Sequence, residues 1–166
     1  PRKVVLYPDA YTNYVLTERG KAAVRVLESL GAEVELATPI ESGRAPLSQG
    51  MIDTATQQAE AVFQDFDPYL EDEFDVVEIE PSDLAAFRRE YEYLLDETRH
   101  DRLAENSYDI MEYVYGLLDN GADDDVLAAP AEPIAYHSHC QQRTLGVEAY
   151  TEAVLEDLGF DMVMSD

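Results

Sequence analysis

The sequence contains a single cysteine and no long hydrophobic run. With only Cys140 among its 166 residues, the chain alone can form neither an internal disulfide nor a metal site of four thiolates. No stretch approaches the roughly 18 apolar residues of a membrane-spanning helix, and the start of the chain does not read as a signal peptide. These absences predict a cytoplasmic domain that is not integral to a membrane, with any membrane association made through partners.

Basic residues are also scarce. The chain has 11 Lys and Arg against 36 Asp and Glu, a net charge of −25 and a pI near 4.1. Such a surface repels phosphate backbones, so nucleic acid is excluded as a partner. The acids are spread along the whole chain, which indicates a protein from a high-salt organism, where carboxylates hold water and salt screens their repulsion.

The sequence does contain enough apolar residues, 46%, to build a core, and its length is that of one ordinary domain. Strand-like segments at 4–7, 33–37, 75–79, 134–136 and 160–164 alternate with helix-like segments at 17–30, 51–66, 81–95 and 141–158. This alternation predicts an α/β domain in three layers, with a mostly parallel sheet covered by helices through Rossmann-like crossovers.

Three other segments are expected to be less regular. Residues 39–49 read as a loop, 98–118 as a helical and irregular excursion, and 119–125 as an exposed acidic link. Ligands of open α/β sheets bind beyond the carboxyl ends of the strands. The loops at 8–14, 39–50, 80–83 and 137–143 are therefore the candidate sites.

The densest set of possible metal ligands is His137-Ser138-His139-Cys140. Imidazole and thiolate suit zinc, copper or iron. If the preceding strand continues, residues 137 and 139 point to opposite faces, so this segment alone cannot surround one ion. Three alternatives remain: a polar strand end with a half-buried thiol, a Cys-His nucleophile pair, and a mononuclear metal site at His137, His139 and Cys140.

Two further loops allow both a functional and a purely structural interpretation. Glu41-Ser42-Gly43-Arg44 is either an anion-binding turn or a plain turn, and no phosphate-binding glycine motif occurs in the chain. Glu80 and Asp83 are either a working carboxylate pair or part of a helix start capped by Ser82. The tyrosines of the excursion and of the helix before it are expected to pack in the core or at an interface: Tyr91, Tyr93, Tyr108, Tyr113 and Tyr115.

Taken together, five segments resemble the cysteine-rich CCG domain of iron–sulfur proteins. They read VVLYPD (4–9), GKAAVRVLE (20–28), GRAPLSQGMID (43–53), EPSD (80–83) and YHSHCQQRTLG (136–146). The family contains iron–sulfur parts of flavin-linked dehydrogenases of the glycolate, D-lactate and anaerobic glycerol-3-phosphate types, and heterodisulfide reductase subunits. In the family the third segment begins Cys-Cys-Gly-Arg-Pro, the fourth reads Pro-Ser-Cys, and the fifth reads His-Cys-His-Gln.

The departures from this pattern determine what the resemblance implies. Glu41 and Ser42 stand where the family has paired cysteines, and Asp83 stands where it has the cysteine of Pro-Ser-Cys. Hard oxygen donors do not replace the thiolates of an iron–sulfur cluster. The resemblance therefore implies a degenerate first repeat with no cluster in this chain alone, while Cys140 remains a candidate ligand in a longer parent and His139 its neighbour.

The resemblance also divides the chain, 1–166, into a degenerate first repeat (1–95), the excursion and acidic link (96–132) and the start of a second repeat (133–166). It implies a fragment of an iron–sulfur oxidoreductase that passes electrons from a flavin dehydrogenase domain or subunit towards a quinone or another acceptor. An alternative is a structural or interaction domain without redox activity, which packs on the flavin domain or on a partner subunit.

Overall fold

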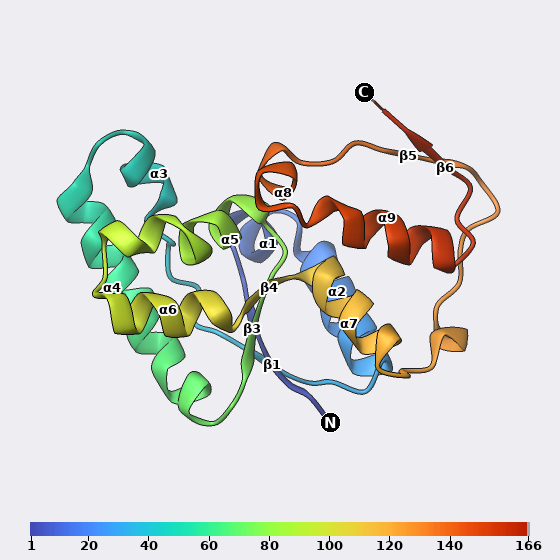
Figure 1. Ribbon diagram of the computed structural model, residues 1–166, viewed down its shortest axis with the longest axis horizontal. Helices are drawn as coiled ribbons and strands as arrows, with labels where there is room; N and C mark the ends of the chain where they lie inside the picture. Colours follow the sequence, from blue (N-terminus) through green and yellow to red (C-terminus); the bar gives the residue numbers. More distant parts are fainter. Residues whose placement is uncertain (166) are drawn as a thin grey trace.

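A four-stranded parallel sheet forms the centre of the protein, in a computed structural model that describes residues 1–165. The strands are β1 (Lys3–Tyr7), β2 (Glu33–Leu36), β3 (Asp75–Glu78) and β4 (Ser107–Asp109), in the order β2-β1-β3-β4. Helices flank both faces of the sheet, with Rossmann-like crossovers between the strands (Figure 1). The predicted fold class is confirmed.

The central strands are apolar because both of their faces are covered. Val4 to Tyr7 of β1 are all buried, as expected for a strand inside a parallel sheet. Successive side chains point to opposite faces, so Val5 and Val76 join one core cluster and Val4 and Val77 the other. The edge strand β2 is largely exposed and carries two glutamates.

One face of the sheet is covered by α4 (Ile52–Glu71), α5 (Pro81–Arg88) and α6 (Glu97–Glu105). Here Tyr7, Phe66, Phe87 and Tyr91 contact one another through tilted and edge-to-face rings, with centroids 5.1 to 6.1 Å apart. The other face is covered by α2 (Thr17–Ser29), α7 (Ile110–Asp119) and α9 (Glu148–Asp157). No helix among residues 1–165 is long and apolar enough to cross a membrane.

Several predicted boundaries were wrong. The 39–49 loop contains the short helix α3 (Arg44–Ser48), and α4 continues to Glu71 because Tyr69 and Leu70 still pack on the core. Ile52, the first residue of α4, is apolar but 51% exposed. The helix predicted over 81–95 ends at Arg88 and is followed by the 3-10 helix η1 (Glu90–Tyr93).

The excursion at 98–118 contains a strand that the sequence pattern did not reveal. Ser107, Tyr108 and Asp109 pair in parallel with Val76, Val77 and Glu78. Three residues are too few for a readable alternation, and β4 is followed at once by a capping box, in which Asp109 and Glu112 start α7. The excursion therefore supplies the fourth strand and α7.

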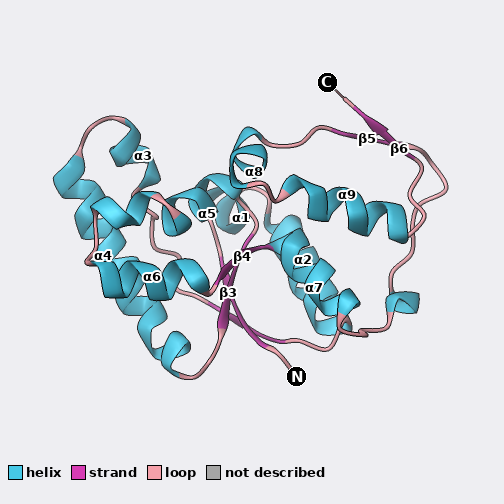
Figure 2. Ribbon diagram, in the orientation of Figure 1, coloured by secondary structure: helices cyan, strands magenta, loops and turns pink. Residues whose placement is uncertain are grey.

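The C-terminal part forms a second, separate sheet. β5 (Ile134–Tyr136) pairs in parallel with β6 (Met162–Met164), away from the four-stranded sheet (Figure 2). The helix predicted over 141–158 is interrupted at Gly146, whose φ of 73° ends α8 (Cys140–Leu145) before α9 begins. The acidic link is largely exposed, as predicted, and its last residues belong to the 3-10 turn η2 (Asp124–Val126). Asp166, the last residue of the predicted second repeat, lies outside the described residues.

Gly43 gives a direct test of how tightly α3 is attached to the core. Its φ is +83°, and an added Cβ would lie 2.9 Å from the carbonyl oxygen of Ala55 on α4. Gly50 has a similar φ of +76° with nothing within 4 Å, so it is a matched control. We expect Gly50→Ala to lower the free energy of unfolding by about 1–2 kcal/mol through backbone strain alone. Gly43→Ala should cost more in denaturant titrations, and equal costs would contradict this close packing.

Candidate functional site

The candidate site lies at the carboxyl ends of β1 and β3. The chain leaves β1 towards β2 on one side and returns to β3 on the other, so the loops after these strands diverge and leave a crevice. α1 (Ala10–Tyr14), α3, α5 and α8 gather at this edge, at the top of Figure 1. We call it the carboxyl edge.

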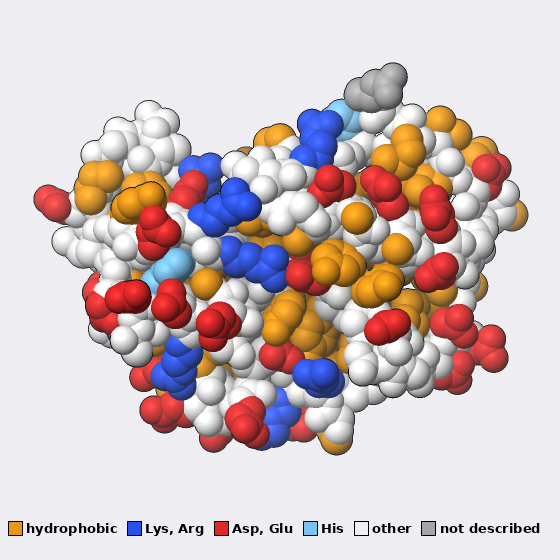
Figure 3. All heavy atoms as spheres, in the orientation of Figure 1, with side chains coloured by type: hydrophobic (Ala, Val, Ile, Leu, Met, Phe, Trp, Pro, Cys, Tyr) orange, Lys and Arg blue, Asp and Glu red, His pale blue; other side chains and the backbone are white. Residues whose placement is uncertain are grey.

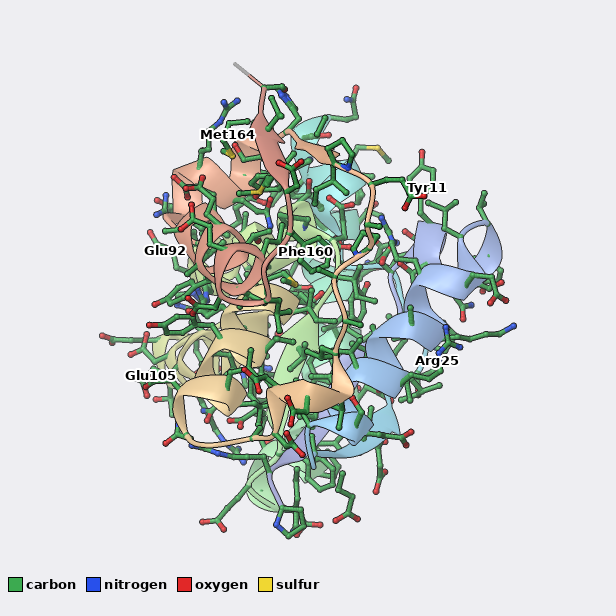
Figure 4. The ribbon with its side chains drawn as sticks, turned by 90° about the vertical axis from the view of Figure 1, so that its right-hand side faces the viewer. Tyr11, Arg25, Glu92, Glu105, Phe160 and Met164 are labelled. Carbon is green, nitrogen blue, oxygen red and sulfur yellow. The ribbon has the colours of Figure 1, made fainter. Side chains whose placement is uncertain are left out.

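A cavity of about 430 Å³ opens at the carboxyl edge. Its lining comes from three separate loops and includes Tyr7, Asp9, Tyr11, Glu41, Ser42, Arg44, Glu80 and Asp83. Tyr11 lies at the upper, outer side of the molecule in Figure 4, at the same end as Met164 on β6, while Arg25 points outward from α2. The lining is rich in carboxylates.

Asp9 follows β1 and begins α1. Its Oδ1 accepts a hydrogen bond from the backbone N–H of Thr12 at 3.0 Å, which caps the helix. The side chain is only 2% exposed. Its Oδ2 has no hydrogen-bond partner among the described residues and lies 3.6 Å from Nη2 of Arg19.

Ser42 connects the second loop to the third. Its Oγ donates a hydrogen bond to Oδ1 of Asp83 at 2.5 Å, and its carbonyl accepts one from the hydroxyl of Tyr91 at 2.6 Å. The backbone N–H of Arg44 donates to Ser42 Oγ at 3.2 Å. The 41–44 turn is thereby fixed against the first turn of α5.

The third loop starts α5, but the predicted cap residue was wrong. Glu80, and not Ser82, is the N-cap: its Oε1 accepts from the Ser82 N–H at 3.2 Å. Pro81 occupies the first helical position, where its missing N–H costs nothing, and this moves the cap back to residue 80. Glu80 and Asp83 both line the cavity.

Asp83 is a buried acid in a negative environment. Its pKa is raised to about 6, chiefly by burial and also by the charges of Asp9, Glu80 and Glu41, while the hydrogen bond from Ser42 lowers it. A carboxyl group with such a pKa exchanges its proton near neutral pH.

Glu78, the last residue of β3, was missed at the sequence level. It is 1% exposed, and neither carboxylate oxygen has a hydrogen-bond partner among residues 1–165. Burial raises its pKa well above the usual range, and so do the charges of Asp83, Asp9, Asp109 and Glu80. The sequence did contain a signal for Glu78: an acidic residue stands directly after Val76-Val77, in a strand that the apolar pattern predicts to be buried.

Asp109 is the corresponding residue at the end of β4, and it is 1% exposed. Its Oδ1 caps α7, and its Oδ2 accepts from Gln142 Nε2 on α8 at 3.3 Å. Burial raises its pKa as well. The structure thus adds Asp9, Glu78 and Asp109 to the predicted site residues Glu41, Ser42 and Asp83.

His139 and Cys140 begin α8 at the same edge. His139 is the N-cap, with Nδ1 accepting from the Gln141 N–H at 3.1 Å, and its Nε2 lies 3.9 Å from Glu80 Oε1. Cys140 is exposed. His137 turns elsewhere, with Nδ1 2.7 Å from Ser165 Oγ.

The donor atoms of His137, His139 and Cys140 do not converge on one point. Within the part of the chain that the structure describes, the single group of three potential ligands whose atoms all lie within 4.8 Å of one another is Asp123, Asp124 and Asp125. Those three aspartates are exposed on the acidic link. The trio from the sequence pattern therefore offers no ready metal site.

The residues at the carboxyl edge do not fit an iron–sulfur cluster. Cluster iron needs thiolate ligands, and the chain offers one exposed thiol, that of Cys140. The positions equivalent to cysteines in the resembling family hold Glu41, Ser42 and Asp83, which present oxygen. Oxygen donors select hard cations.

A second cleft, of about 480 Å³, lies at the opposite, amino end of the sheet. Four tyrosines line it: Tyr108, Tyr113, Tyr115 and Tyr150. Tyr108 stacks edge-to-face on Tyr113, and Tyr115 lies against Tyr150 with ring centroids 5.2 Å apart. Figure 3 shows hydrophobic side chains gathered over β4, α7 and α9, with acidic side chains around them.

Comparisons with known proteins give no relative: no protein-family model matches the chain, and searches of curated proteins and of solved structures find no match. The fold and the side-chain geometry therefore carry the functional argument.

Asp83→Asn tests the electrostatics of the carboxyl edge. Because the folded-state pKa of about 6 exceeds the usual 3.8, the folded protein binds this proton more tightly than the unfolded chain. Ionised Asp83 therefore destabilises the fold at neutral pH, and the destabilisation disappears as pH falls from about 6 to about 4. In EDTA at pH 7, Asp83→Asn should raise the free energy of unfolding by up to about 2–3 kcal/mol.

The difference between Asp83→Asn and wild type should vanish below pH 4. Asp53→Asn, in the exposed first turn of α4, is the matched control, and it should change stability by less than 1 kcal/mol at either pH. Parallel stability–pH curves for wild type and Asp83→Asn would contradict the raised pKa.

Proposed function

We propose that this chain is a CCG-type α/β domain of an iron–sulfur, flavin-linked oxidoreductase. It acts there on the electron path from a flavin domain, which oxidises a 2-hydroxy acid or glycerol phosphate, towards a quinone or another acceptor. The observation that carries the proposal is the hydrogen bond between Ser42 and Asp83.

This contact supports the proposal because it is independent of the sequence resemblance. The resemblance assigns former cysteine positions to two segments whose key residues, Ser42 and Asp83, are 41 positions apart in the chain. Cysteines that bind one cluster must lie close together in space. The number of residues between them does not by itself bring them together. Ser42 Oγ and Asp83 Oδ1 are in direct contact at the carboxyl edge.

The fifth segment of the resemblance, 136–146, meets the same edge. α8, which begins at Cys140, packs against α5, which contains Asp83. His139 lies beside Glu80, 3.9 Å from its carboxylate. In the proposed parent, Cys140 is a cluster ligand and His139 orients or tunes it from nearby. Within this chain, Ser42 and Asp83 hold the two loops together without thiolates.

Anaerobic treatment with iron and sulfide tests the proposal. The source gene is sequenced on both sides of this chain, and its full product and the present chain are treated in parallel. We expect cluster absorbance and a flavin spectrum in the full product, and no cluster in the present chain, since one thiol cannot hold it. Cys140→Ser should reduce the cluster content of the full product. A full product that contains neither flavin nor cluster would refute the proposal.

The tyrosine-lined cleft favours a second candidate function, an interaction domain without redox activity that packs on the flavin domain. Aromatic side chains with a polar tip are enriched at the centres of interfaces, and four tyrosines line this cleft.

Replacing two of these tyrosines tests this second function. We expect Tyr115→Ser with Tyr150→Ser to weaken binding to the flavin dehydrogenase domain about tenfold or more, measured by calorimetry. Tyr14→Ser, at a 71% exposed position on α1, is the control and should leave affinity unchanged. Equal affinities for all variants would exclude the cleft as the interface.

A further inference from the structure

We propose that the carboxyl edge binds a divalent cation of the hard, oxygen-preferring class, such as Mg²⁺ or Mn²⁺, through the carboxylates of Asp9, Glu78 and Asp83. The inference deepens the proposed function, because it names what this site takes in place of a cluster. It stands on the contacts and burial of these side chains and would hold for the chain taken alone.

Glu78 is the observation that points to a ligand. A carboxylate that is removed from water and given no hydrogen bond is costly, so buried acids are normally paired, hydrogen-bonded or bound to a metal. Glu78 is 1% exposed and has no partner on either oxygen among the described residues. Glu78 is paired across the sheet with Tyr7, which lines the cavity, and the charges of Asp83, Asp9, Asp109 and Glu80 act on it.

Among the described residues, the protein's own cations pair with this cluster at Asp9 alone. Arg44 pairs with Glu90 at 3.2 Å, and Arg88 with Glu112 at 2.7 Å. Arg19 stands 3.6 Å from Asp9. In residues 1–165, no ion pair involves Glu78 or Asp83. The site therefore has an excess of negative charge that a divalent ion would offset.

Adaptation to salt does not account for these acids. Carboxylates that keep a protein hydrated in concentrated salt must contact solvent. Asp9 and Glu78 are instead 2% and 1% exposed, at the ends of the two central strands. Buried acids at these positions cannot hold water at the protein surface, so their role lies inside the site.

The available atoms match the coordination chemistry of a hard cation. Within residues 1–165, Asp9 Oδ2 and both oxygens of Glu78 make no hydrogen bond, and Asp83 accepts from Ser42 through Oδ1. Mg²⁺ takes one or two carboxylates and keeps several waters, and the adjoining 430 Å³ cavity has room for them. Outside the acidic link, no three such oxygens lie within 4.8 Å of one another in the described chain, so binding would draw these side chains together.

Manganese binding to the chain in EDTA-treated form tests the inference. Free Mn²⁺ is measured by its electron paramagnetic resonance signal, in concentrated KCl to suppress weak binding to the acidic surface. We expect one saturable Mn²⁺ per chain, displaced by Mg²⁺. Glu78→Gln and Asp83→Asn should each weaken it about tenfold or more. Both variants remove a buried carboxyl group whose ionisation is unfavourable in the fold, so they should fold at least as well as wild type, which circular dichroism checks.

The matched control is Asp123→Asn with Asp124→Asn, which alters the exposed acidic trio of the link. It should leave the saturable site unchanged. Loss of the site in this control, or equal Mn²⁺ binding by wild type and Glu78→Gln, would overturn the inference. This result is separable from the proposed function, because Mn²⁺ binding is measured without flavin or cluster, and the cluster test does not involve Glu78.

Discussion

The parallel pairing of β1 with β3 is the constraint on which the candidate site depends. Its register sets Tyr7 beside Glu78 at the carboxyl edge. Because the strand order reverses at this pair, the loops that follow turn to opposite sides and leave Asp9, Ser42 and Asp83 around one crevice. If the pairing of β1 with β3 shifted by one residue, Glu78 would point to the other face of the sheet. These side chains would then no longer surround one crevice.

The aromatic cluster of Tyr7, Phe66, Phe87 and Tyr91 forms a buried apolar layer beneath the crevice. It stabilises the fold by burying large rings, and it also removes water from the neighbouring carboxylates. The same packing therefore supports the domain and raises the pKa values of Glu78 and Asp83. Buried carboxyl groups with raised pKa values lower the free energy of unfolding at neutral pH. Such a loss of stability is typical of functional positions.

Helices and strands with a clear hydrophobic periodicity could be predicted from the sequence, whereas short ones could not. The runs at Val4–Tyr7 and Asp75–Glu78 and the apolar face of α2 could be read directly, because burial on known faces leaves a regular pattern. β4 and α3 are too short for a period to appear. The division of 141–158 into α8 and α9 depends on one left-handed glycine, Gly146.

By itself, the sequence determined the α/β class, the position of the candidate loops and the scarcity of thiol groups, since these follow from composition and periodicity. Through the resemblance, it also predicted Ser42 and Asp83 as former cysteine positions, which stays a prediction. Only the tertiary structure brought Ser42 into contact with Asp83 and made Glu78 a buried acid with no hydrogen-bond partner in the described part of the chain. The reason is physical: solvation and hydrogen bonding at one residue depend on loops and strands far away in the chain, which no local pattern records.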